Sequence, residues 1–146
     1  MNSLTKMGNI SLRLVLGAIV AVLFGCASMS GDNSIKVTLS GAEEVPPVST
    51  KATGSGTIVV KADKSISGSV TTSGVAGVAA HIHLGTAGKN GPVIVPMTKT
   101  SDNEWTIQAG AKLTDEQYAS FKAGDLYVNV HSAANKGGEI RGQLKP

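Results

Sequence analysis

The chain has 146 residues, of which 41% are apolar, 16% charged and only 3% aromatic, and its formal net charge is +3. The apolar content excludes a disordered chain, and the scattered placement of the basic residues excludes a nucleic-acid-binding patch. Eighteen glycines among many Val, Thr, Ile and Ser residues favour short strands joined by tight turns.

Residues 1–25 have the pattern of a secretory signal. Lys6 and Arg13 accompany an apolar run over residues 14–24, which is shorter than the roughly 20 residues that a membrane-spanning helix needs. This run ends in Leu-Phe-Gly-Cys, with the cysteine at position 26. The ending resembles the bacterial lipobox, in which the cysteine is lipidated and becomes the mature N-terminus. Cys26 is the only cysteine in the chain, so we predict that it carries the lipid.

The lipid predicts a protein of the bacterial cell envelope whose membrane contact is its N-terminal anchor. Ala27 follows the cysteine, which favours the outer membrane, with the protein facing the periplasm or the cell surface. Residues 26–34 are expected to be the lipidated N-terminus and a flexible tether, and residues 35–146 the globular domain. With its only cysteine used as the anchor, the domain has no thiol for a disulfide or a metal.

Eight segments of the domain have the apolar–polar alternation and β-branched content of strands. The strand that carries Pro96 is expected at a sheet edge, because proline cannot donate a hydrogen bond to a neighbour. Hairpin spacing between the segments predicts an all-β, antiparallel sandwich or barrel. The expected strands cover residues 35–39, 54–61, 66–72, 80–85, 93–99, 104–108, 125–132 and 139–144.

One short helix is expected over residues 114–123. Thr114 is suited to the N-cap, and Gln117 three residues later completes a capping box. Gly124 is placed to end the helix in the left-handed conformation that glycine favours.

All three histidines of the chain fall in expected strands. His81 and His83 point to the same face of their strand, because successive strand side chains alternate. His131 lies in the strand-like run 126–131, on the same face of that strand as Tyr127 and Asn129. Neutral imidazoles suit copper and zinc, and a set of three leaves one coordination position open.

Five separate motifs, in this order, resemble the CHRD domain, a family named after chordin, a secreted inhibitor of bone morphogenetic proteins, and rich in bacterial members. The resemblance covers about residues 35–145. The motifs are residues 39–47 (LSGAEEVPP), 81–85 (HIHLG), 91–93 (GPV), 124–131 (GDLYVNVH) and 138–144 (GEIRGQL).

The resemblance implies an immunoglobulin-like Greek-key sandwich with remote similarity to Cu/Zn superoxide dismutase. In that light His81 and His83 look like the copper-binding His-x-His pair of the dismutase, and His131 looks like its late copper-binding histidine. The zinc-ligand cluster and the disulfide cysteines of that enzyme have no counterpart in this sequence, so dismutase activity is not expected.

Three interpretations stay open at this stage. The leading one is a non-enzymatic binding module for a protein partner in the envelope or outside the cell. The second is a copper or zinc site at His81, His83 and His131, with Asn129 or Glu139 orienting a ligating ring. In the third, the polar strand faces are simply the solvated outside of the sheet and the histidines have no metal.

Overall fold

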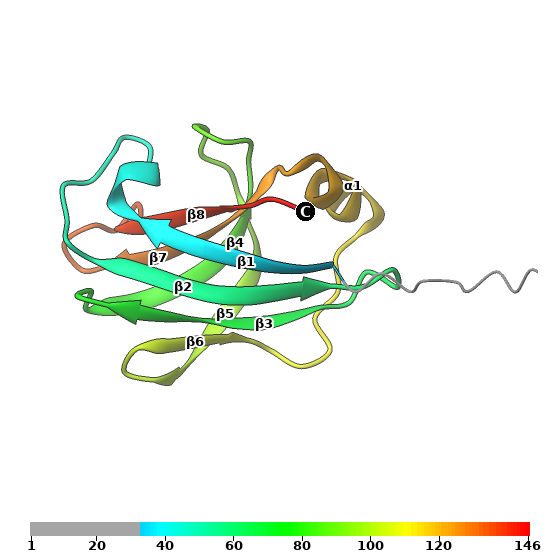
Figure 1. Ribbon diagram of the computed structural model, residues 1–146, viewed down its shortest axis with the longest axis horizontal. Coiled ribbons are helices and arrows are strands. Elements are labelled where there is room, and N and C mark those ends of the chain that lie inside the picture. The colour runs from blue at the N-terminus through cyan, green and yellow to red at the C-terminus, as the bar shows by residue number, and fades with distance from the viewer. Residues whose placement is uncertain (1–32) are drawn as a thin grey trace, which may run out of the picture.

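The computed structural model describes residues 33–146, and the signal segment, Cys26 and most of the tether lie outside these residues. Eight strands, a short 3-10 helix (η1) and one α-helix make up the described part (Figure 1). No helix among these residues is long and apolar enough to cross a membrane. In chain order the elements are β1 (Asn33–Ser40), η1 (Gly41–Glu43), β2 (Thr53–Val60), β3 (Ile66–Ser73), β4 (Gly77–Leu84), β5 (Val93–Ser101), β6 (Glu104–Ile107), α1 (Asp115–Ala123), β7 (Leu126–Ser132) and β8 (Ile140–Leu144).

The all-β, antiparallel fold with one short helix is confirmed. The strands form one closed barrel in the order β1-β2-β3-β6-β5-β4-β7-β8. A pairing of Ser40 with Arg141 closes the barrel between β1 and β8. The close approach at this closure is possible because residue 142 is glycine, and a Cβ there would collide with the carbonyl oxygen of Thr38. Two separate sheets, as in a sandwich, are therefore not confirmed.

The sequence places α1 almost to the residue. The Thr114 hydroxyl accepts a hydrogen bond from the Gln117 backbone N–H at 3.2 Å, and the Gln117 side chain accepts one from the Thr114 N–H at 2.9 Å. Gly124 ends the helix with φ of 81°, a left-handed conformation that side chains disfavour. The predicted capping box and terminating glycine are both confirmed.

The expected edge position of the strand with Pro96 is wrong for the strand as a whole, because β5 lies between β4 and β6. The pairing explains how proline is tolerated there. Pro96 is paired with His81 on β4, while the pairing with β6 begins one residue later, between Met97 and Ile107. Pro96 therefore has a strand partner on one side only.

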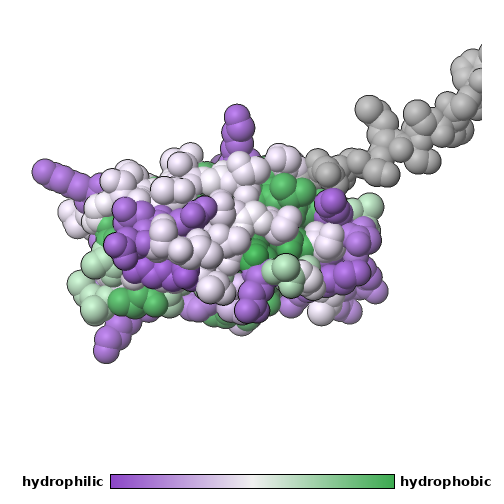
Figure 2. Space-filling view, turned by 90° about the horizontal axis from the view of Figure 1, so that it is seen from below, coloured by the Kyte–Doolittle hydropathy of each residue, from purple (hydrophilic) through white to green (hydrophobic). Residues whose placement is uncertain are grey.

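The core fills the barrel with aliphatic side chains from alternating positions of every strand. On β4 and β7 these are Ala80, Ile82, Leu126, Val128 and Val130, all fully buried. On the outside, hydrophilic and near-neutral residues surround separate apolar patches in the view from the β6 side (Figure 2). The outward face of β4, β7 and β8 differs, because much of it is buried.

Candidate metal centre

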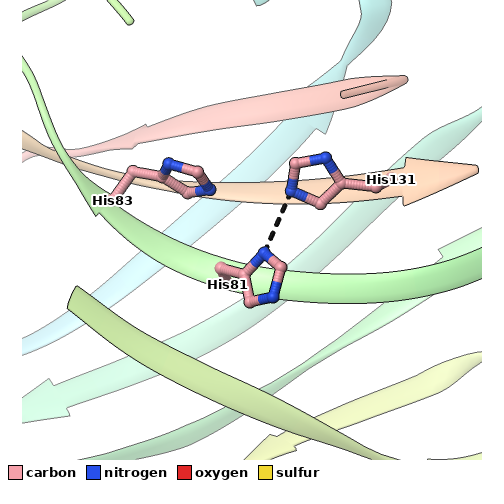
Figure 3. Close-up of side chains that lie close together, drawn as sticks. All are labelled: His81, His83 and His131. Atoms are coloured by element: carbon pink, nitrogen blue, oxygen red, sulfur yellow. Dashed lines mark hydrogen bonds between the residues drawn. The ribbon is translucent and has the colours of Figure 1, made fainter. Parts of the chain in front are cut away.

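The three histidines lie on the outward face of two neighbouring strands. Strand β4 carries His81 and His83, and in the antiparallel pairing with β7 His131 is opposite Ala79 and Asn129 is opposite His81. One ring nitrogen from each histidine lies within 4.8 Å of the other two. Figure 3 shows the rings of His83 and His131 facing each other, with His81 beside them.

His83 is held by the backbone of the loop between β4 and β5. Its Nδ1 lies 2.9 Å from the Gly91 carbonyl oxygen, which can only accept, so Nδ1 carries the ring proton. Nε2 is then an acceptor, and it is buried with no hydrogen-bond partner among the described residues. A buried acceptor without a donor costs about 1–3 kcal/mol, which makes this nitrogen a candidate metal ligand.

His131 is oriented in the same way. Its Nδ1 donates to the Lys136 carbonyl oxygen at 3.0 Å, which leaves the lone pair on Nε2. That nitrogen lies 3.1 Å from Nδ1 of His81, which donates to it (Figure 3). The three nitrogens directed toward one another are therefore Nδ1 of His81 and Nε2 of His83 and His131.

The surroundings favour neutral rings. Burial is the largest effect on both rings, and it lowers the pKa of His81 and the pKa of His83. For His83 the hydrogen bond to Gly91 is the next largest effect and raises the pKa, while the His131 ring and the Arg141 charge lower it by less. The His131 ring also lowers the pKa of His81. Since an imidazole must be deprotonated to bind a metal, these two rings are prepared to act as ligands at neutral pH.

Tyr127 and Arg141 form a buried stack behind His83. The His83 ring packs on the Tyr127 ring with centroids 4.9 Å apart and planes 15° apart. The Arg141 guanidinium carbon lies 3.5 Å from the Tyr127 centroid. The Tyr127 hydroxyl accepts a hydrogen bond from the Gly91 N–H at 3.1 Å, so Gly91 positions both rings.

The interpretation that the polar faces of the strands are simply the solvated outside of the sheet is wrong for the outward face of β7 and β8. Tyr127, Asn129 and Arg141 are each 1% exposed. The loop after β4 covers Tyr127 and Arg141, because the Gly91 N–H donates to the Tyr127 hydroxyl and Arg141 donates to the Thr86 carbonyl oxygen and the Asn90 side chain. Asn90 in turn donates to the Val45 carbonyl oxygen, which ties this loop to the connection between β1 and β2.

Asn129 and Glu139, the residues expected to orient a ligating ring, lie nearby but have other partners. Glu139 accepts a hydrogen bond from the Thr50 hydroxyl, and hydrogen bonds led by that of Ser132 lower its pKa. Asn129 donates to the Gly137 carbonyl oxygen at 3.4 Å. Within residues 33–146, the carbonyl groups of Gly91 and Lys136 hold the rings instead.

A buried carboxyl group adjoins Asn129. Glu44 is 4% exposed and, like Asn129, has a buried side-chain oxygen without a partner among the described residues. A Cβ at position 138 would collide with both side chains, so Gly138 leaves room for them. Burial raises the pKa of Glu44 to about 7, although the Arg141 charge and a hydrogen bond to Asn129 act in the opposite direction.

A family model described as CHRD domain matches residues 35–144 of the chain. The match covers β1 through β8 and includes all three histidines. We found no match to the chain among curated proteins or among solved structures.

Replacing Glu44 with glutamine should change how stability depends on pH. In the folded protein Glu44 loses its proton near pH 7 instead of near pH 4.5, so the wild type loses stability as the pH rises through that interval. Glu44→Gln should escape this loss and exceed the wild type by on the order of 1–3 kcal/mol at pH 8. Denaturant unfolding between pH 4 and 8 measures the effect.

The exposed neighbour provides the matched control, and Glu43→Gln should follow the wild-type profile. Parallel pH profiles for Glu44→Gln and the wild type would show that Glu44 ionises as freely in the folded chain as in the unfolded one.

Proposed function

The chain belongs to the CHRD domain family, and we propose that its domain is a non-enzymatic binding module that holds a copper or zinc ion on His81, His83 and His131. The observation that carries the proposal is the buried Nε2 of His83, which has no partner among the described residues and belongs to the group of three converging ring nitrogens. Coordination would give this nitrogen the partner that the protein does not.

The hydrogen bonds behind the rings support the same proposal. Metal-binding histidines generally donate their second ring N–H to a carbonyl or carboxylate, which fixes the tautomer and the ring plane. His83 and His131 do so with the carbonyl oxygens of Gly91 and Lys136. Both rings thus present a lone pair on Nε2 in the absence of any metal.

Binding requires a small rearrangement of side chains. Two nitrogens bound to one ion at about 2.0–2.1 Å lie at most about 4.2 Å apart, so any pair of these ring nitrogens spaced near the upper bound of 4.8 Å would have to move closer. The hydrogen bond between His81 and His131 also has to break, and the ring proton of His81 has to move from Nδ1 to Nε2, so that the ring stays neutral. Three neutral imidazoles fit copper and zinc alike and leave a position for a further ligand.

The relationship to the superoxide-dismutase-like Greek-key fold is part of the proposal, whereas dismutase activity is not. The strand order supports the relationship. Strands β4, β5 and β6 are successive neighbours and β7 returns beside β4, which is the strand order that defines a Greek key.

Metal titration of the full chain tests the histidine site. The Cys26→Ser background prevents the thiol from competing for the ion. We expect one equivalent of Cu(II) or Zn(II) to bind near pH 7, and binding to weaken below about pH 6.5 as protons compete for the rings. His83→Ala and His131→Ala should each reduce affinity by more than about 100-fold, since loss of a mere supporting partner already costs about 10–100-fold.

Asn103→Ala, in the exposed turn between β5 and β6 and outside the group of three histidines, serves as the control and should bind like the parent. Stoichiometric binding that persists in the variant lacking all three histidines would reject the site. Absence of binding by the parent protein at neutral pH would reject it as well.

We also propose that Cys26 anchors this module in the bacterial envelope, in the outer membrane, where an envelope or extracellular protein is the second kind of partner. The signal-like segment 1–25 and the position of the only cysteine support the anchor. The start of β1 lies at the end of the barrel near α1, whereas η1 and the hairpin between β7 and β8 lie at the opposite end (Figure 1). A tether attached to β1 would leave that far end free.

Palmitate labelling in a bacterial host tests the anchor. The wild-type chain should incorporate label and sediment with membranes, and Cys26→Ser should lose the label and become soluble. Ser28→Ala, two residues away, should behave as the wild type does. An unlabelled wild-type protein would contradict the lipid assignment and leave the histidine site unaffected.

A further inference from the structure

A shallow apolar depression adjoins the histidines. Its volume is about 500 Å³, and its wall includes His81 and His131. Val78 and Val93, which also line it, are the two large apolar side chains left exposed in the described part of the chain, at 62% and 48%. A ligand in this depression would contact the valines and the two rings at once.

The charge around the depression has one sign. Of the described residues that line it, none is acidic, and Lys136 is the one with a permanent charge. Three neutral imidazoles leave the charge of a divalent ion uncompensated. An anion therefore fits this site better than a neutral or cationic ligand.

We propose that the open position of the metal site takes a small monocarboxylate with an apolar body, its carboxylate on the ion beside Lys136 and its body between Val78 and Val93. This inference rests on the metal site proposed above and adds the class of ligand. The apolar wall selects the body of the ligand, since burying apolar surface is favourable, and the charges select its head group.

The position of the depression in the fold suits a ligand from solution. Lys136 belongs to the hairpin between β7 and β8, at the end of the barrel opposite the start of β1 (Figure 1). The backbone carbonyl oxygen of Lys136 accepts the hydrogen bond from His131, and the Lys136 ammonium group takes no part in that bond. The side chain can therefore be changed without removing the hydrogen bond that orients the ring.

Spectroscopic titration tests the proposal on the full chain with Cys26→Ser, loaded with one equivalent of Co(II), whose visible spectrum reports the ligands of the ion. Benzoate should shift the spectrum and bind about tenfold more tightly than acetate, whereas benzyl alcohol, which has the same body without the charge, should leave it unchanged. The metal-free protein should not bind benzoate measurably.

Two variants separate the contributions. Lys136→Gln, measured with the ion fully loaded, should weaken benzoate and acetate by the same factor of several-fold. The double variant Val78→Ser, Val93→Ser should reduce the preference for benzoate over acetate to less than about threefold.

The outcomes distinguish the two proposals. Equal affinity for benzoate and acetate, or equal benzoate binding with and without Co(II), would overturn the assignment of the ligand while the metal site stands. If none of Co(II), Cu(II) and Zn(II) binds, the metal site is rejected, and the ligand assignment is rejected with it.

Discussion

The packing of the Arg141 guanidinium on the Tyr127 ring is the contact on which the rest of the site depends. Arg141 is fully buried, and it holds the loop after β4 through the Thr86 carbonyl oxygen and the Asn90 side chain. That loop contains Gly91, whose carbonyl oxygen orients His83 and whose N–H reaches the Tyr127 hydroxyl. These contacts orient the His83 ring, with its Nε2 directed toward the other two histidines.

A buried guanidinium needs compensation, because it stays charged at every accessible pH. Carbonyl and amide oxygens supply most of it, and the ring face of Tyr127 adds an attractive surface. Glu44 is the carboxyl group whose pKa responds to Arg141, yet burial keeps that pKa near 7. The covered face therefore combines a permanent positive charge with an acid whose pKa lies near 7. Burial opposes protonation of His83 most strongly, and the Arg141 charge adds a smaller effect in the same direction.

Local sequence signals were sufficient to predict the strands and the helix. They were insufficient to predict which segments bury the outward face beside the histidines. Alternation located the strands, and Thr114, Gln117 and Gly124 defined α1, because capping depends on residues a few positions apart. Alternation also put His81 and His83 on one face, and the pairing of β4 with β7 brought His131 beside them. Nothing local indicates the closure of β1 on β8, the backbone carbonyls of Gly91 and Lys136 as ring holders, or the burial of Asn129. Each of these depends on contacts between segments far apart in the chain.

X-ray absorption spectroscopy of the full chain with Cys26→Ser, loaded with one equivalent of Cu(II), tests the central claim most directly. The structure predicts three imidazole nitrogens at about 2.0–2.1 Å from the ion, with the outer-ring scattering that histidine ligands produce. Loss of one imidazole from the fit in His83→Ala would identify the buried ring as a ligand. A spectrum with no imidazole scattering, or one that is identical in the parent and in His83→Ala, would contradict the account.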